Sequence, residues 1–596
     1  MDDITQRDLR SLVHATADQS TLDCLAGLSA ESLFDHRDGL GNEEVCRLTY
    51  RRLRRLGEQL GPSSKLLADP SRLFTTLEWC SVTSPSLFLA TTLHTCLGLG
   101  AIDEFGAGRD DIGDWIGELD SMNSFGSLLV TETGLGNSHI GIRTEAVHDP
   151  LTGEFVLHTP DAQAAKLMPN VGLDGVRKLG VVYARLLTSG EDRGVFGFVV
   201  PIRDENGPLP GVSITALPEV PFLPLDYATI GFDRVRISAR SLLHDSARLE
   251  PDGRFHDPLG GPEERLLRSL DVRHRAWAAS AAALAAAIRT TAALAVRFAA
   301  DRRTLSRSAP EQPVLSYRSQ QLPLFDALAQ SYALTSLVNR VKREWSGAAS
   351  DPDPSWSSGF RRTIGLVKAH CGAAAERIAS ECGQRCGSHG MFAVNRFVGY
   401  LGLGHVLGPA AGDSRLITLE AARAMAAGTA YRPPSPRITQ PNRRDVSQPR
   451  IALDLIALRE RGLHETLADG MRTAVRRGQP PFEAWNNRSW LASEFVETHV
   501  TRLALEALLA DADRLRDGRG KDAVTRLASF FALRHIAGNS GWYLAEEVLT
   551  PQQVRMIPVA LNLLCERIHP DAVSLADALL LPGSTVTAAA QFSPSS

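Results

Sequence analysis

The spacing of apolar residues along this chain changes twice, and these changes constrain the fold more than any other feature. From the first residue to about residue 125, apolar residues recur every three or four positions, which indicates helices. Short β-branched segments begin near Ser127, and the helical spacing returns near Pro262 and then continues. The sequence therefore predicts a helical region, a strand region and a second helical region, in that order.

The middle region predicts strands that are separated by turns. Segments rich in Val, Ile and Phe alternate with turn sequences such as Asp149–Pro150 and Glu205–Pro208. No helical pattern lies between these segments, which favours a small antiparallel barrel or sandwich over a sheet with helical crossovers. The predicted strands include 155–158, 180–186, 194–200 and 230–237.

The last region predicts long helices. They run from Glu264 to about Arg303, from Val314 to Trp345 and from Arg361 to Cys386, and they are long enough to form a bundle. Residues 431–450 are rich in proline and polar residues, which is typical of a linker. We expect a mostly helical protein with a helical domain (1–126), a β domain (127–255), a helical bundle (256–432), a linker (433–450) and a second bundle (451–596).

Composition excludes several classes of protein. Lys and Arg number 64 against 68 Asp and Glu, so the net charge of −4 gives no reason to expect nucleic-acid binding. The apolar run Ala276–Ala300 contains Arg289 and Arg297, which favours a buried helix over a membrane span. The eight cysteines lack the paired spacing of a zinc site, so no metal is expected.

The ends of the sequence and its basic residues bear on location and source. The N-terminus lacks a basic segment followed by an apolar core, and Ser593–Ser596 is not a peroxisomal signal. We therefore expect a cytoplasmic protein. Only six of the basic residues are Lys, and this excess of Arg is typical of a GC-rich bacterial genome.

Several local motifs occur in an order that resembles one family along nearly the whole chain. The region plan resembles the acyl-CoA dehydrogenase superfamily, and the extra C-terminal helical block resembles its acyl-CoA oxidase branch, of which this chain would be a divergent member. The matching segments are Leu129–Gly136 (LVTETGLG), His158–Lys166, Val199–Asp204 (VVPIRD), Pro313–Gln321, Glu381–Gly390 (ECGQRCGSHG) with Asn395–Arg396, and Asn539–Leu544.

The resemblance implies FAD as the cofactor and assigns residues to it. A flavin needs small residues and backbone amides close to its ring and pyrophosphate, which glycines permit. The resemblance also implies a homodimer, an acyl-CoA or acyl-carrier-protein substrate, and molecular oxygen as a candidate electron acceptor. The alternative is that the glycines only form a turn and that Arg303 is a solvated residue at a helix end. The residues that match cofactor positions of the family are Thr131, Gly134, Gly136, Gln384, Gly387 and Arg303, the last acting from the neighbouring subunit.

The catalytic position of the family holds the wrong residue in this chain. Relatives carry a glutamate that removes the α-proton of the thioester while a hydride leaves the β-carbon. Here the matching segment is His405–Arg415, in which Gly412 and Asp413 align with the family's residues and Ala411 occupies the glutamate position. An alanine cannot accept a proton, and loss of a general base typically costs about 10²–10⁴ in rate.

Other differences from the family lie in motifs that face flavin or substrate. Scaffold segments such as Phe232–Ile237 stay close to the family pattern. This clustering indicates either changed chemistry or lost chemistry. The altered positions are Asn137–Ser138, Leu167, Ser388 and Leu225–Ala228.

Three residues are candidates to replace the missing base. His274 lies near the position where a minority of relatives carry their glutamate, although a histidine on a helix surface is the alternative. Asp413 is acidic, but relatives carry an acid there without using it as the base. His389 follows the family pattern, so a structural or flavin-side role is its default.

Three functions remain open at this stage. The first is a flavoenzyme of acyl-CoA oxidase type with altered chemistry in specialised metabolism. The second is a conventional oxidase with a relocated base, which gives a trans-2-enoyl thioester and hydrogen peroxide. The third is a non-catalytic homologue that binds FAD or forms oligomers.

Overall fold

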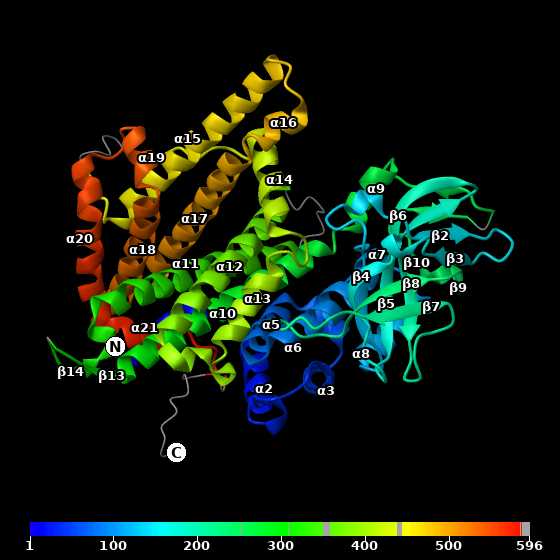
Figure 1. Ribbon diagram of the computed structural model, residues 1–596, viewed down its shortest axis with the longest axis horizontal. Coiled ribbons are helices and arrows are strands. Elements are labelled where there is room, and N and C mark those ends of the chain that lie inside the picture. Colours follow the sequence, from blue (N-terminus) through cyan, green and yellow to red (C-terminus); the bar gives the residue numbers. More distant parts are fainter. Residues whose placement is uncertain (251, 308, 350–357, 438–443, 585, 587–596) are drawn as a thin grey trace. The chain divides into compact units, whose positions relative to one another are not determined.

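The computed structural model forms two compact units, and it describes residues 1–250, 252–307, 309–349, 358–437, 444–584 and 586 (Figure 1). We call Asp23–Ala279 the mixed unit, and Met1–Leu22 with Ser280–Ser596 the helical unit. These two units are coarser than the five-part division expected from sequence, which stays a prediction.

The mixed unit begins with a series of helices, one of which is capped by an aspartate. Asp69 accepts hydrogen bonds from the amides of Ser71 and Arg72 and thereby caps the helix that starts at Pro70. A π-helix, Thr92–Leu99, continues the helix before it and places His94 in the interior. The helices are α2 (Gln19–Ser29), α3 (Asn42–Leu60), α4 (Ser63–Ala68), α5 (Pro70–Thr83), α6 (Pro85–Thr91), α7 (Gly100–Phe105) and α8 (Gly113–Asp120).

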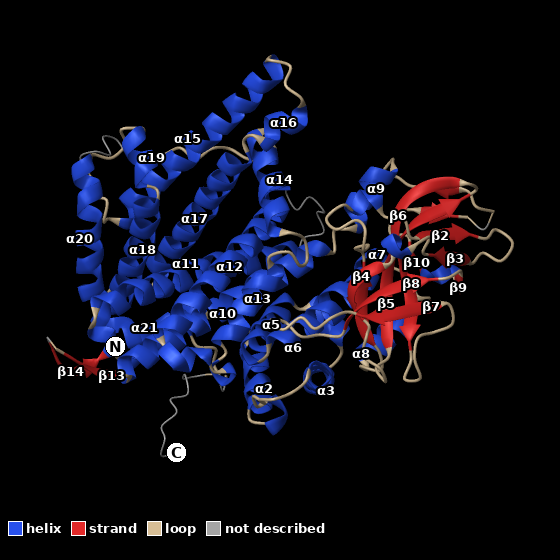
Figure 2. Cartoon of the chain, viewed as in Figure 1, coloured by secondary structure: helices blue, strands red, loops and turns tan. Residues whose placement is uncertain are grey.

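The β region of the mixed unit contains a seven-stranded sheet and a three-stranded sheet (Figure 2). The larger sheet has the order β10-β6-β5-β2-β3-β9, with β1 paired to β5, and the smaller has the order β4-β8-β7. The inward faces of both sheets share one core that includes Phe155, Phe196, Phe198 and Ile230. The strands are β1 (Phe125–Leu129), β2 (Glu145–His148), β3 (Phe155–His158), β4 (Lys166–Asn170), β5 (Lys178–Thr188), β6 (Glu191–Arg203), β7 (Val212–Ala216), β8 (Tyr227–Phe232), β9 (Val235–Ile237) and β10 (Leu242–Leu243).

The structure corrects two details of the predicted β region. Most pairs are antiparallel as expected, but β1 and β2 each run parallel to β5. The strand predicted over 230–237 is two strands, because Arg234 has a left-handed φ of 50° and turns the chain.

The predicted helix from Glu264 to Arg303 is also two helices, α9 (Pro262–Ser269) and α10 (Arg273–Asp301). The amide of Asp271 bonds to the Arg268 carbonyl at 2.9 Å, and the Asp271 carbonyl accepts from the amide of His274 at 3.0 Å. The break therefore ends one helix and starts the next without leaving these groups unpaired.

The helical unit contains a bundle of long helices, and two of the predicted ones are confirmed within a few residues as α11 and α12. The helix α1 (Asp3–Val13) packs in this unit against α21. Part of the predicted linker, 438–443, lies outside the described residues. The other elements are α11 (Arg318–Ala349), α12 (Ser358–Arg385), α13 (Phe397–Leu407), α14 (Ser414–Ala426), α15 (Pro449–Arg476), α16 (Pro481–Asn486), α17 (Ser489–Arg514), α18 (Arg519–Gly538), α19 (Ser540–Ala545), α20 (Pro551–Ile568), α21 (Ala572–Leu579) and the hairpin β13 (Arg303–Ser306) and β14 (Ala309–Pro313).

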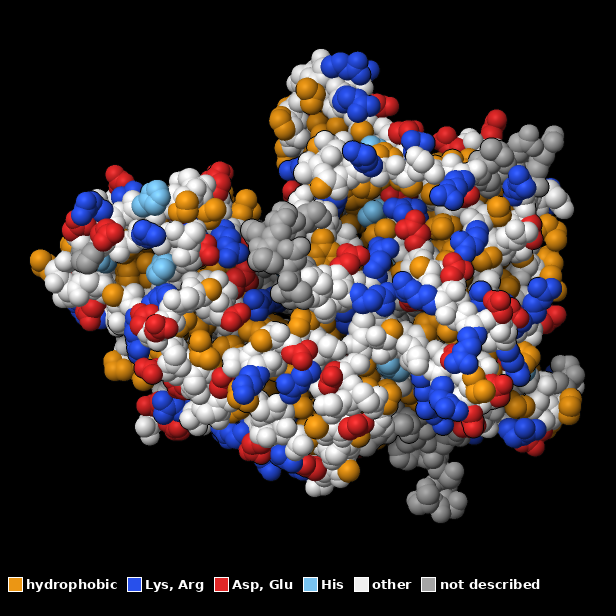
Figure 3. All heavy atoms as spheres, turned by 180° about the vertical axis from the view of Figure 1, so that it is seen from behind, with side chains coloured by type: hydrophobic (Ala, Val, Ile, Leu, Met, Phe, Trp, Pro, Cys, Tyr) orange, Lys and Arg blue, Asp and Glu red, His pale blue; other side chains and the backbone are white. Residues whose placement is uncertain are grey.

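Two segments are long and apolar enough to cross a membrane by length and composition alone. They are Pro85–Phe105 and Pro262–Asp301, and their most apolar windows are 78% and 100% buried inside the protein. Burial of this kind is typical of core helices. On the face shown in Figure 3, basic and acidic side chains are interspersed and form no single-sign stripe.

Candidate active site

The predicted site residues are divided between the two units, and each group is described within its own unit. Thr131, Gly134, Gly136 and His274 belong to the mixed unit. Arg303, Gln384, Gly387, His389, Ala411 and Asp413 belong to the helical unit.

A buried ion pair fixes the segment that carries the predicted flavin-binding glycines. The Lys166 ammonium lies 3.0 Å from the Glu132 carboxylate, and both side chains are fully buried. The carboxylate also accepts bonds from the amides of Arg143 at 2.9 Å and Thr144 at 2.8 Å. Lys166 donates as well to the Val130 carbonyl. These contacts tie the TETGLG segment to strand β4, so Glu132 has a structural role here.

The electrostatics of this pair follow from its burial. Burial alone would raise the pKa of Glu132, but the Lys166 ammonium and the two amide donors hold it below its ordinary value. Burial lowers the pKa of Lys166 to about 8, although the Glu132 carboxylate opposes that shift. Both side chains are therefore charged at neutral pH, and each compensates the other.

The segment 131–137, which we call the glycine loop, fits a role in holding a flavin. A Cβ at Gly134 would lie 2.8 Å from the Gln163 amide oxygen, 3.0 Å from its Cβ and 3.2 Å from its carbonyl oxygen, so a larger residue here would require Gln163 to shift. Gly136 is exposed, and a Cβ there would meet nothing within 4 Å. Among the described residues, the amides of Gly136 and Asn137 have no hydrogen-bond acceptor. Exposed amides of this kind suit the oxygens of a flavin or its pyrophosphate.

His139 is a residue near this loop that the sequence interpretation missed. It is half-buried in the turn that follows Asn137, and burial lowers its pKa, with Arg273 and Lys166 adding to the shift. A histidine three residues after the glycine motif could have been noted from the sequence. Its place beside Arg273 depends on the fold and could not be predicted.

His274 is buried, so the alternative of a helix-surface histidine is wrong. Its side chain sits at the start of α10, and the residue is 7% exposed. Nδ1 lies 2.9 Å from the Asp271 carbonyl, and the ring packs edge-on against Trp277. Because a carbonyl only accepts, Nδ1 carries the proton in the neutral ring and Nε2 is the basic nitrogen.

Ala411 lies in a tight turn that a buried lysine holds. Its φ is +54°, in the left-handed region that disfavours alanine. The Lys368 side chain is fully buried below the turn, and its ammonium donates to the carbonyls of Ala410 at 2.9 Å and Gly412 at 2.8 Å. It also reaches the carbonyl of Gly408 and the hydroxyl of Ser414. Hydrogen bonds from one buried ammonium thus hold this turn, although the glutamate expected at Ala411 is absent.

Burial also sets the charge of this lysine. It lowers the pKa of Lys368 to about 8, against the Asp413 carboxylate, which raises it. Four oxygen acceptors around one ammonium replace the water that burial removes.

Asp413 caps the helix that follows this turn. Its carboxylate accepts from the amides of Arg415 at 2.8 Å and Leu416 at 3.4 Å at the start of α14. This is the ordinary role of an aspartate before a helix. The capping contacts explain Asp413 without a catalytic role.

The remaining predicted positions lie at the surface or at helix ends. Arg303 is half-exposed on β13 and donates to the Glu311 carbonyl at 2.9 Å. Gln384 is exposed in the last turn of α12, and Gly387 follows with a φ of +60°. The alternative in which Arg303 ends a helix is corrected, because α10 stops at Asp301 and Arg303 begins a strand. Their roles toward FAD stay predictions.

His389 packs between aromatic rings. Its ring centroid lies 5.3 Å from that of Phe298 and 6.0 Å from that of Phe392. The backbone carbonyl of His389 accepts from the side chain of Asn395 at 2.6 Å. These contacts are those of a packed side chain, and the default that sequence gave, a structural or flavin-side role, stays a prediction.

Two family models match the helical part of the chain. The C-alpha1 domain of acyl-CoA oxidase matches residues 271–426, and the acyl-CoA oxidase model matches residues 448–589. Together they cover half of the chain.

Relatives and solved structures extend this likeness. Peroxisomal acyl-coenzyme A oxidase 1 of Arabidopsis thaliana is 27% identical over 503 residues, covering 78% of this chain and 73% of that protein. The Rattus norvegicus enzyme of the same name is 26% identical over 496 residues, covering 78% and 74%. The structure of Arabidopsis acyl-CoA oxidase 1 aligns with a TM-score of 0.81 at 21% identity, over 98% of this chain and 92% of that one.

A further structure carries ligands of its own. Acyl-CoA oxidase-2 of Caenorhabditis elegans, bound with FAD, ascaroside-CoA and ATP, aligns with a TM-score of 0.83 at 20% identity over 99% of this chain and 93% of that one. These likenesses define the predicted class, an FAD-dependent oxidoreductase with helical domains around a central β domain. Within that class, the chain belongs to the acyl-CoA oxidase family.

Proposed function

We propose that this protein is an FAD-dependent oxidoreductase of acyl-CoA oxidase type in which glutamate-catalysed removal of the α-proton has been lost. Its substrate would be an acyl thioester or a related small molecule. The observation that carries the proposal is that Ala411 occupies a turn whose backbone is held by hydrogen bonds on both sides. Lys368 contacts the carbonyls on both sides of Ala411, and Asp413 caps the next helix.

The residues of the glycine loop support the cofactor part of the proposal. Thr131 and the free amides of Gly136 and Asn137 would hold FAD, on a segment fixed by the Glu132–Lys166 pair. When bound, FAD supplies a two-electron oxidant that can take a hydride from a substrate carbon. The loop's own task is to bind and orient FAD, because the Glu132 carboxylate in this segment is buried in its pair with Lys166 and in bonds to backbone amides.

The methyl group of Ala411 changes what the site can do. It leaves space that a glutamate would fill, and it cannot hold a proton. A substrate whose C–H or N–H bond needs no strong base would still react, whereas a thioester would lose about 10²–10⁴ in rate. This difference supports altered chemistry, and we place it in specialised metabolism.

A second candidate function is favoured by the geometry of His274. Its Nδ1 hydrogen bond to Asp271 leaves Nε2 as the basic nitrogen, which is the form needed to accept a proton. With this relocated base the protein would act as a conventional oxidase, giving a trans-2-enoyl thioester and hydrogen peroxide with molecular oxygen as acceptor.

Other parts of the proposal rest on the family resemblance and on the sequence. They are a homodimeric assembly, a cytoplasmic location, and a substrate carried either by CoA or by an acyl carrier protein.

The test is an absorbance spectrum of the purified protein, followed by anaerobic titration with acyl-CoAs of several chain lengths. A bound flavin that thioesters reduce only very slowly supports the main proposal. Rapid reduction overturns it. If His274→Gln then abolishes that reduction and the exposed control His569→Gln does not, the relocated base is supported instead. A protein that binds no flavin after incubation with FAD favours a non-catalytic homologue.

A further inference from the structure

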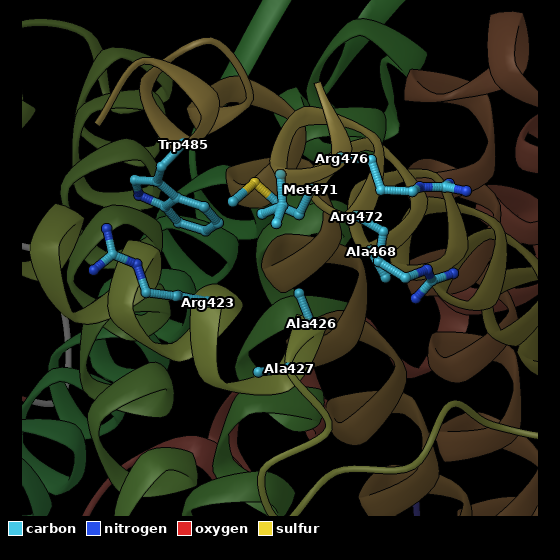
Figure 4. Close-up of a pocket in the computed structure, with 9 residues that line it drawn as sticks. Arg423, Ala426, Ala427, Ala468, Met471, Arg472, Arg476 and Trp485 are labelled. Carbon is cyan, nitrogen blue, oxygen red and sulfur yellow. The ribbon is translucent and has the colours of Figure 1, made fainter. Parts of the chain in front are cut away.

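A cavity of about 660 Å³ lies in the helical unit, away from the residues discussed above. Its walls come from the end of α14, the end of α15 and the short helix α16. Figure 4 shows Arg423 beside Trp485 on one side, and Arg472 with Arg476 on the other. The volume falls within the range of about 300–1,000 Å³ that is usual for small-molecule sites.

The floor of this cavity is apolar and well ordered by packing. Ala426, Ala468, Met471 and Trp485 line it. The Trp485 indole is 9% exposed, and the Arg423 guanidinium lies 4.9 Å from its ring centroid. A cation over an aromatic face holds both side chains in place. The floor therefore offers a hydrocarbon-binding surface whose shape is largely formed.

The edge of the cavity is positively charged. Arg423, Arg472 and Arg476 line it, and no acidic residue does. Arg472 pairs with Asp469, and Arg423 lies 3.6 Å from Glu420. Arg476 has no carboxylate partner among the described residues, and its guanidinium donates to the Thr473 hydroxyl at 3.5 Å. Arg476 is therefore available to bind an anion.

This cavity is distinct from the turn at Ala411. The helix α14 begins at Ser414, directly after the turn, and Arg423 lies nine residues further along it. At 1.5 Å per residue the separation along the helix is on the order of 14 Å. The side chains that line the cavity do not include Lys368, Ala411 or Asp413.

We propose that this cavity is a second binding site that takes a fatty carboxylate, with the hydrocarbon chain on the Met471–Trp485 floor and the carboxylate on Arg472 and Arg476. Arg472 and Arg476 lie at one end of the apolar floor, and Arg423 is stacked on Trp485 at the other, an arrangement that matches an amphipathic anion better than a neutral lipid or a cation. The proposal is independent of the function proposed above, because it uses none of the same residues.

Calorimetric titration with dodecanoate below its micelle concentration tests this site. We expect one site in the unaltered protein, about tenfold weaker binding in Arg472→Gln/Arg476→Gln, and affinity within about twofold in the neighbouring control Arg477→Gln. Dodecyltrimethylammonium, which has the same chain and the opposite charge, should not bind.

A second variant keeps the test decisive if the arginine variant folds poorly. Ala427 is exposed at the cavity, and Ala427→Trp should fill the space and abolish dodecanoate binding without changing the fold. Binding that survives both variants would place dodecanoate elsewhere and overturn the proposal. So would an absence of binding to the unaltered protein, or binding only to anionic lipid vesicles and not to monomeric dodecanoate.

Discussion

The two motif loops of this protein are held by opposite charges. In the glycine loop a buried carboxylate, Glu132, accepts hydrogen bonds from Lys166 and from two backbone amides. In the Ala411 turn a buried ammonium, Lys368, collects three backbone carbonyls and a hydroxyl. Each loop is therefore fixed by one buried charge that satisfies several backbone groups.

The difference between the loops lies in what they present. The glycine loop matches the expected motif up to Gly136, departs from it at Asn137–Ser138, and offers the amides of Gly136 and Asn137 to a cofactor. The Ala411 turn is equally well supported by hydrogen bonds, but it presents only a methyl group at the position that we propose for a lost catalytic glutamate. The comparison teaches that two loops can be held alike by a buried charge and still differ in the groups that they present to a ligand.

The largest expected effect is in the glycine loop. Glu132→Ala leaves Lys166 buried without its counter-charge, and we expect a loss of about 3–5 kcal/mol in the free energy of unfolding. Chemical denaturation measures it. The control is Arg143→Gln, which keeps the backbone amide that donates to Glu132 and removes only an exposed ion pair with Asp161, so it should change the free energy of unfolding very little. Equal effects of the two variants would contradict this account.

A smaller loss is expected in the Ala411 turn. Lys368→Met leaves the carbonyls of Ala410 and Gly412 without their donor, but it also removes the cost of burying a charge. We expect a net loss of about 2 kcal/mol in the free energy of unfolding. Lys521→Met, which removes a surface lysine paired with Asp517, should have almost no effect. If Lys368→Met had a higher free energy of unfolding than the unaltered protein, the hydrogen bonds of Lys368 to the Ala411 turn would not be needed for stability.

The unaltered protein and Lys368→Met should also differ in how the free energy of unfolding depends on pH. The pKa of Lys368 is about 8 in the folded state against 10.5 as the ordinary value, so the unfolded chain binds more protons between these two values. Stability conferred through Lys368 therefore rises with pH across this window. The advantage of the unaltered protein over Lys368→Met should widen by about 1 kcal/mol per pH unit. A constant difference would mean that the lysine is not desolvated.

The smallest effect concerns the backbone of the turn. Because Ala411 has a left-handed φ, Ala411→Gly should raise the free energy of unfolding by up to about 1 kcal/mol. Ala427 has a φ of −79°, and Ala427→Gly should give no gain. Thermal unfolding of both variants makes the comparison, and a gain in both would remove the argument from strain.

Much of the fold could be predicted from the sequence because each region has a clear hydrophobic period. The break between α9 and α10 was missed, since the chain carries no proline or glycine there and the break depends on backbone bonds at Asp271. The parallel pairing of β1 and β2 with β5 was also missed, because alternation alone does not give strand direction.

The motifs of the candidate site could be read from the sequence, whereas the contacts that support them could not, and the roles of the motif residues stay predictions. The Lys368 ammonium on α12 donates to carbonyls about forty residues later in the chain, and no local sequence pattern encodes such contacts. One signal did exist. Four of the six lysines in this arginine-rich chain, at 166, 178, 342 and 368, are buried. A compact ammonium fits a closed cage that a guanidinium would not, so retained lysines can mark such positions.

The most direct test of the central claim is the rate of anaerobic flavin reduction by one acyl-CoA, compared between the unaltered protein and Ala411→Glu. Ala411→Gln is the control that matches size without basicity. The account predicts that glutamate, but not glutamine, raises the rate by at least about 10². An unaltered protein that already reacts as fast as Ala411→Glu would contradict the claim that the base has been lost.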